Sequence, residues 1–143
     1  MPALSSYLIA ILAGWIIAQG AKYIIVAAKN RNFDHVRQLY LSGNMPSAHS
    51  ATTVALATVV GLRDGIDSAV FAVAALFAAV VMYDAVMVRR SVGEQGMAIT
   101  SVIRELKSKT KLPRSAKGHE PLEVVVGALL GVCIGLVVFL ATR

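Results

Sequence analysis

Three long apolar segments constrain this sequence more than any other feature. Residues 4–28, 68–88 and 122–142 each carry one charged side chain, namely Lys22, Asp84 and Glu123. Each segment is close to the ~20 residues that an α-helix needs to cross the hydrocarbon core of a bilayer. Only 15% of the 143 residues are charged, against about 25% in soluble domains. The chain is therefore predicted to be an integral membrane protein with a single domain.

A fourth apolar segment, residues 50–62, is uncharged but short, and it spans a bilayer only if residues 46–49 extend the helix. We predict an all-α membrane domain over residues 1–143 with about four transmembrane helices, at about 4–28, 46–62, 68–88 and 119–142. Loops are expected at 29–45 and 89–118. In the latter loop, Ile99, Val102, Ile103 and Leu106 follow helical spacing. They predict a short amphipathic helix that lies on the membrane surface or packs against the end of the bundle.

The basic residues are distributed unevenly over this topology. The two longer loops hold eleven lysines and arginines, whereas the opposite side holds Arg63 and Arg143. Under the positive-inside rule, the longer loops face the cytoplasm and both termini face outward. In a bacterium this would place the protein in the inner membrane. The net charge of +6 is thus explained by topology, and no aromatic interleaving or recognition motif supports a nucleic-acid partner.

Unusual polar residues recur at one membrane face each time the chain reaches it. They are Gln19 and Lys22 in the first helix, His49 at the start of the second, Asp84, Arg89 and Arg90 at the end of the third, and His119 and Glu123 at the start of the fourth. The opposite loop, residues 63–67, has nothing comparable. This coincidence predicts a functional site at the cytoplasmic face.

The chemistry of these residues suits phosphoryl transfer. Lys22, Arg89 and Arg90 supply positive charge, and an arginine can bind phosphate oxygens with two parallel hydrogen bonds. His119 and Glu123 are four residues apart and share a helix face, so the carboxylate can orient the imidazole for nucleophilic attack. His49 then remains as a general acid. Such a site needs no metal or other cofactor.

Most of these residues also have a simpler interpretation. A histidine beside a helix start is often only a cap or a surface residue, and Glu123 could interact with the dipole of the helix N-terminus. Lys22 could extend toward the lipid headgroups, and Arg89 and Arg90 could act as membrane anchors. Asp84 is costly inside a membrane segment unless it is paired, and an arginine just past the helix end is its expected partner.

Two motifs resemble those of the type 2 phosphatidic acid phosphatase and vanadium-dependent haloperoxidase superfamily. Pro46-Ser47-Ala48-His49 is similar to its P-S-G-H motif, and residues 119–127, HEPLEVVVG, are similar to its H-x-P-x-D-V-x-x-G segment. Tyr83-Asp84-Ala85, Val88-Arg89-Arg90 and Gly93-Glu94-Gln95 resemble a divergent branch of small membrane proteins.

The resemblance covers about residues 19–131 and implies a role for each matched residue. It implies that His119 is the nucleophile, Glu123 its orienting carboxylate and His49 the acid. Ser47, Lys22, Arg89 and Arg90 would bind phosphate or vanadate, with Asp84 and Gln19 in support.

The sequence departs from the superfamily at four places. Glu123 replaces an aspartate and Ala48 a glycine, Lys22 is not followed by the arginine-proline of the first motif, and Pro113 stands where the third motif has serine-arginine.

Three functions are compatible with these features. The first is a metal-independent phosphatase that hydrolyses a phospholipid or isoprenoid phosphate or diphosphate through a phosphohistidine. The second is a phospholipid-binding or scaffolding protein with weak catalysis. The third is a small transporter subunit in which Lys22 and Asp84 line a path. The sequence leaves the oligomeric state open, a homo-oligomer included.

Overall fold

The structure is a computed structural model that describes residues 5–30, 45–113 and 118–143. The described residues form five α-helices and no strand: α1 (Ser6–Asn30), α2 (Ala48–Asp64), α3 (Ala69–Tyr83), α4 (Arg89–Glu105) and α5 (Pro121–Ala141). A π-helical turn, η2 (Asp84–Val88), joins α3 to α4. The all-α prediction is confirmed for these residues. The predicted loop at 29–45 lies mostly outside the described part of the chain, as do residues 114–117 of the predicted loop at 89–118.

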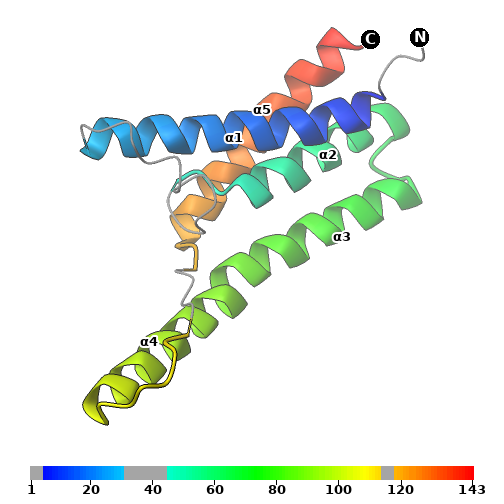
Figure 1. Cartoon of the computed structure of the whole chain (residues 1–143). Coiled ribbons are helices and arrows are strands. Elements are labelled where there is room, and N and C mark those ends of the chain that lie inside the picture. Colours follow the sequence, from blue (N-terminus) through cyan, green and yellow to red (C-terminus); the bar gives the residue numbers. More distant parts are fainter. Residues whose placement is uncertain (1–4, 31–44, 114–117) are drawn as a thin grey trace.

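Three helical segments are long and apolar enough to cross a membrane: Ser6–Ala28, Ala69–Glu105 and Pro121–Ala141. The 17-residue helix α2 is not among them, so the fourth span stays a prediction. Helix α2 is instead the centre of the bundle, since it packs against α1, α3 and α5 (Figure 1). This central position is what brings its first turn close to the other helices.

The start of α2 differs slightly from the sequence prediction. The helix begins at Ala48 rather than Pro46, because Ser47 is its N-cap and accepts a hydrogen bond from the Ser50 backbone N–H at 3.4 Å. A serine oxygen in this position satisfies one of the free N–H groups of the first turn. Pro121, by contrast, occupies the first turn of α5, where a missing N–H costs nothing.

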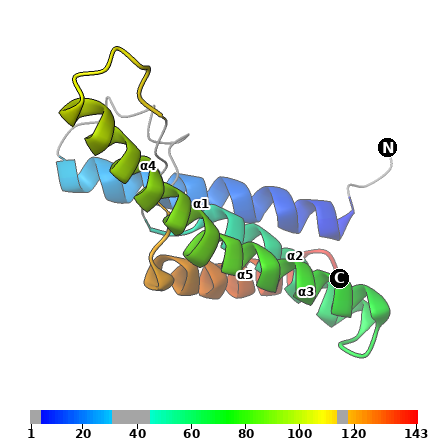
Figure 2. The same cartoon turned by 90° about the horizontal axis from the view of Figure 1, so that it is seen from below.

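Helices α3 and α4 form one continuous helical segment of 37 residues, and Figures 1 and 2 show it as an unbroken ribbon. The sequence predicted a loop from residue 89 with a short helix inside it. The structure has helix from Arg89 itself, because arginine, glutamate and glutamine favour helix and no proline interrupts the segment. The helix ends at Glu105, followed by Lys107 with a φ of 47°.

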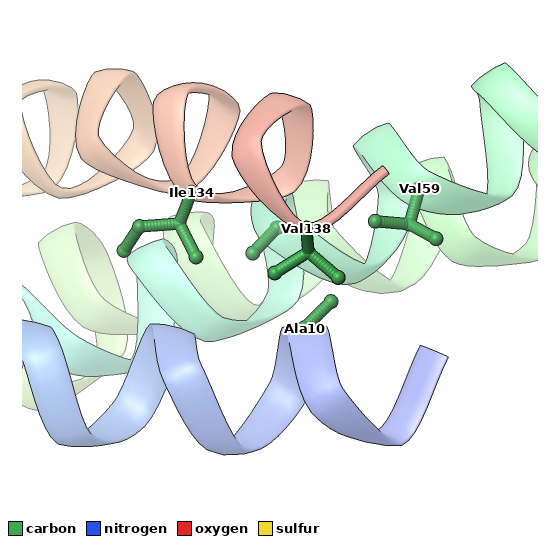
Figure 3. Close-up of a cluster of buried hydrophobic side chains, with 5 residues drawn as sticks. Ala10, Val59, Ile134 and Val138 are labelled. Atoms are coloured by element: carbon green, nitrogen blue, oxygen red, sulfur yellow. The ribbon is translucent and has the colours of Figure 1, made fainter. Parts of the chain in front are cut away.

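The apolar core lies between α1, α2 and α5. Ala10, Val59, Ile134 and Val138 meet there (Figure 3). A Cβ added at Gly131 would lie 2.6 Å from the Ala51 carbonyl oxygen. Helices approach this closely through small residues when packing, rather than the hydrophobic effect, drives their association in a membrane.

Candidate active site

A hydrogen bond between His119 and Glu123 forms the centre of the site. The His119 Nδ1 atom lies 2.8 Å from Glu123 Oε2, and the exposed fractions of the two side chains are 3% and 14%. When the carboxylate is ionised it can only accept a hydrogen bond, so the ring donates from Nδ1, and in the neutral imidazole Nε2 then keeps its lone pair. The pair is therefore arranged to present Nε2 as a nucleophile or base.

The first turn of α5 holds Glu123 in place. The Glu120 backbone N–H donates to the same Glu123 Oε2 atom at 3.2 Å, which is half of a capping box. Both hydrogen bonds therefore converge on one carboxylate oxygen. The cap of α5 thus fixes the carboxylate, and the carboxylate in turn fixes the imidazole ring of His119.

The π-turn η2 holds the backbone of His119. The Arg89 N–H donates to the Asp84 carbonyl, five residues back, instead of to the Ala85 carbonyl four residues back as in an α-helix. The Ala85 carbonyl accepts from the His119 N–H at 3.2 Å. A π-turn often occurs at a functional site, and here it provides a carbonyl that joins the segment before α5 to the end of α3.

A glycine makes this contact possible. A Cβ on Gly118 would lie 2.4 Å from both the backbone N and the Cα of Arg90, a distance that no side chain tolerates. The chain before His119 therefore lies directly against the start of α4.

The start of α2 is attached to α5 in a similar way. The Ser47 N–H donates to the Glu123 carbonyl at 3.0 Å, and a Cβ on Gly127 would lie 2.5 Å from the Ser47 carbonyl oxygen. The Ser47 side chain is fully buried, and its Oγ also accepts from the Ser50 hydroxyl at 2.9 Å. Ser47 is thus a helix cap in this structure, and its predicted contact with phosphate stays a prediction.

His49 lies in the first turn of α2 and is exposed. Its imidazole is within electrostatic range of Lys22, Asp84, Arg89 and His119. Five of the residues that the sequence placed at one membrane face, His49 included, are thus near one another although they come from four helical segments.

Lys22 supplies a nearly buried positive charge, since 5% of the residue is exposed. Its ammonium group is within electrostatic range of the Glu123 carboxylate. Gln19 lies three residues earlier on α1 and is half-buried. A buried charge is retained only when partners or a ligand compensate its desolvation, so Lys22 fits a site that takes an anion.

The two arginines differ from Lys22 because carboxylates already contact them. Arg89 Nε lies 2.6 Å from Asp84 Oδ2, and Arg90 Nε lies 3.2 Å from Glu94 Oε1. Arg89 is thus the partner that Asp84 was expected to need. The Arg90 pair is more than half exposed on both sides, and such a pair contributes little to stability. Within the described residues, no group of three or more metal-binding side chains lies together.

Sequence reasoning did not identify the Ala85 carbonyl, Gly118 or Gly127 as parts of this site. The glycines gave a signal, since one directly precedes His119 and the other ends the second motif. The Ala85 carbonyl gave no signal in the sequence, because a carbonyl inside a helix becomes available to accept a hydrogen bond from outside it only through the π-turn.

Comparison with known proteins identifies the family of the chain. The chain matches the Divergent PAP2 family over residues 4–134 and belongs to that family. It is also 37% identical over 145 residues to "Uncharacterized membrane protein YuiD" of Bacillus subtilis (strain 168), and the alignment covers 91% of each chain. No solved structure matches the chain. The predicted membership of a divergent branch of the superfamily is therefore confirmed, as is the membrane class.

Proposed function

We propose that this protein is a membrane-embedded phosphatase that hydrolyses a lipid phosphate or diphosphate ester through a phosphohistidine. The observation that carries the proposal is the buried His119, whose Nδ1 lies 2.8 Å from a carboxylate that the cap of α5 holds in place. A histidine held in this way is an oriented nucleophile. Its position beside a second histidine and a buried lysine suits a phosphate ester.

The first step is attack on phosphorus. The Nε2 lone pair of His119 forms a bond to phosphorus while the bond to the alcohol oxygen breaks, and His49 gives its proton to the leaving oxygen. Glu123 stabilises the positive charge that develops on the His119 ring. Lys22 and Arg89 stabilise the charge on the equatorial oxygens, as preorganised cations do in phosphoryl transfer.

The second step returns the enzyme to its starting state. His49, now neutral, takes a proton from a water molecule whose oxygen attacks the phosphorus. The bond between phosphorus and Nε2 breaks, inorganic phosphate leaves, and His49 is protonated again. Both steps use the same residues, so no metal or cofactor enters the reaction.

The substrate class follows from the position of the site. His119 lies just before the membrane-length helix α5, and His49 lies in the first turn of α2. We expect this end of the bundle to lie at the level of the lipid headgroups, where a phospholipid or an isoprenoid phosphate can present its phosphate without leaving the membrane. The positive-inside rule places this end in the cytoplasm. Phosphate and vanadate are then expected to bind as product and transition-state analogue.

A second candidate is a phospholipid-binding protein with little turnover. It is favoured by the pairing of both Arg89 and Arg90 with carboxylates, which leaves Lys22 as the cation with the least compensation. In that case the site binds phosphate without hydrolysing the ester.

Phosphate release by the purified protein decides between the two. The substrates are phosphatidic acid, an isoprenyl diphosphate and a short-chain alkyl phosphate, each with and without a chelator. We expect chelator-resistant release that His119→Ala abolishes and that Glu105→Gln, an exposed carboxylate at the end of α4, leaves unchanged. Lipid binding without release would favour the second candidate, and release by His119→Ala would contradict the first.

A further inference from the structure

The proposed reaction gives no part to Asp84, although this carboxylate lies among the groups of the candidate site. Its Oδ2 atom accepts a hydrogen bond from Arg89 Nε at 2.6 Å. The exposed fractions of the two side chains are 36% for Asp84 and 46% for Arg89. Neither charge is enclosed by the core, so both can act on groups that lie nearby.

The π-turn η2 brings these two side chains together. Residues five apart in an α-helix point about 140° away from each other around the axis, which would separate Asp84 from Arg89. In η2 the Arg89 N–H donates to the Asp84 carbonyl, so the five residues complete slightly more than one turn and both side chains lie on one face. The same turn frees the Ala85 carbonyl that binds the His119 N–H. The position of the Asp84 carboxylate is thus set by the element that also holds the backbone of His119.

Four charged or titratable groups act on the His49 imidazole from the elements packed around it. They are Lys22 of α1, Asp84 of η2, Arg89 of α4 and His119 before α5. The two cations and the second imidazole oppose a proton on His49, because like charges repel. Within the described residues, Asp84 is the one carboxylate of this group, and its negative charge favours the proton.

Glu123 does not take the place of Asp84. Its Oε2 atom is already hydrogen-bonded to His119 Nδ1 and to the Glu120 N–H, at 2.8 and 3.2 Å, so its charge serves the ring of His119. His49 nevertheless needs its proton before the ester bond breaks, since the leaving oxygen takes it up. A general acid surrounded by cations holds its proton more tightly when a negative charge lies close by.

We propose that Asp84 is a positioning residue that keeps the proton on His49 until the leaving oxygen takes it. Asp84 acts through its charge, and the hydrogen bond from Arg89 Nε holds that charge in place. Asp84 itself neither transfers a proton nor touches the substrate. The role in catalysis rests on the proposed function, whereas the effect of Asp84 on the proton of His49 is measurable without turnover.

The test is a titration of His49 by NMR. The protein carries isotope-labelled histidines and is held in detergent micelles, and His35→Gln removes the third imidazole from the spectrum. His49→Gln then identifies the His49 signal by its loss. The midpoint of the titration is compared among variants of the Asp84 pair.

Three variants change this pair. Asp84→Asn removes the charge but keeps an oxygen that can accept from Arg89 Nε, Asp84→Glu keeps the charge, and Arg89→Gln removes the cation. Glu94→Gln is the matched control, because Glu94 also accepts from an arginine Nε, that of Arg90 at 3.2 Å, but does not act on His49.

We expect the midpoint of the His49 titration to move to lower pH by about one unit in Asp84→Asn. This is the lower end of the range for a neighbouring charge, because water screens a partly exposed pair. Arg89→Gln should move the midpoint to higher pH, while Asp84→Glu and Glu94→Gln should leave it near that of the wild-type protein. An unmoved or higher midpoint in Asp84→Asn would overturn the proposal.

A double variant, Asp84→Asn with Arg89→Gln, repeats the measurement without leaving an arginine unpaired. Its midpoint should lie about one unit below that of Arg89→Gln alone. Equal midpoints in these two proteins would overturn the proposal even if Asp84→Asn on its own did not fold.

Hydrolysis of an alkyl and an aryl phosphate is measured separately across the same pH range. Since the reaction needs His49 in its protonated form, the fall of kcat for the alkyl phosphate at high pH should begin about one unit lower in Asp84→Asn, and the aryl phosphate should be affected much less. A shifted titration with an unmoved alkyl profile would overturn the catalytic role of Asp84. A shifted titration without any hydrolysis would refute the phosphatase alone, and hydrolysis with an unmoved titration would refute the role of Asp84 alone.

Discussion

Replacing Glu123 by glutamine tests how the carboxylate assists His119. The His119 Nδ1–H and the Glu120 N–H both donate to the same oxygen of Glu123. The single carbonyl oxygen of a glutamine can therefore accept both hydrogen bonds, and the imidazole keeps the tautomer that leaves Nε2 free. What the substitution removes is the negative charge beside the ring.

The magnitude follows from that loss. Hydrogen bonds to a charged group contribute about 1.5–3 kcal/mol and neutral ones about 0.5–1.5 kcal/mol. The difference of about 1–1.5 kcal/mol acts where the ring becomes cationic, so kcat/KM should fall roughly tenfold. Because both hydrogen bonds persist, the melting temperature of Glu123→Gln should stay close to that of the wild-type protein.

Glu123→Ala is the informative comparison. It leaves the nearly buried His119 ring without its acceptor and removes the capping contact of Glu120, which costs about 0.5–2 kcal/mol of stability. Its activity should approach that of His119→Ala, with a lower melting temperature. The assay is phosphate release from a long-chain alkyl phosphate, with thermal unfolding of each variant in parallel. Full activity of Glu123→Gln would show that the negative charge of Glu123 does not assist the reaction. If Glu123→Gln were as inactive as His119→Ala, the argument that His119 keeps its tautomer would be refuted.

Three further predictions follow from the geometry. His49→Ala should lower kcat for hydrolysis of an alkyl phosphate by about 10²–10⁴-fold, the usual contribution of a general acid. It should lower kcat for an aryl phosphate much less, and equal losses of kcat on both substrates would contradict the role of His49 as general acid. Gly127→Ala should lower the stability by about 1–3 kcal/mol in thermal unfolding, since the new Cβ would lie 2.5 Å from the Ser47 carbonyl oxygen; an unchanged melting temperature would contradict this close packing. In intact cells, an impermeant thiol reagent should label a cysteine at Asp67 and not one at Ser108, and the reverse pattern would invert the proposed topology.

The sequence predicted the parts of the fold that depend on local hydropathy. The apolar segments near the N-terminus and the C-terminus correspond to α1 and α5 within a few residues, because a bilayer-length apolar run has few alternatives to a helix. The contact of His119 with Glu123 was also predictable from their spacing of four residues, although α5 begins at Pro121 rather than at residue 119, so that His119 lies just before the helix. Asp84 was expected to need an arginine, and Arg89 contacts it.

Contacts between distant parts of the chain were not predictable in this way. The link from the Ala85 carbonyl to the His119 N–H depends on a π-turn, and nothing in the sequence of Asp84–Val88 distinguishes a π-turn from an α-helix. The same holds for the unbroken passage from α3 into α4, where a pair of arginines resembles the end of a membrane segment but does not stop a helix. The cap at Ser47 moved the start of α2 past Pro46, because capping competes with the preference of proline for a first turn.

The central claim is that phosphorus becomes bonded to His119, and trapping the intermediate tests it most directly. The purified protein is mixed with a lipid phosphate carrying radioactive phosphorus, and the reaction is stopped within one turnover at alkaline pH, where a phosphohistidine survives. The labelled peptide is then identified by mass spectrometry, with His119→Ala as the control. We expect label on His119 that chases into inorganic phosphate. Release of phosphate with label on another residue, or with no labelled protein at any time, would contradict the mechanism.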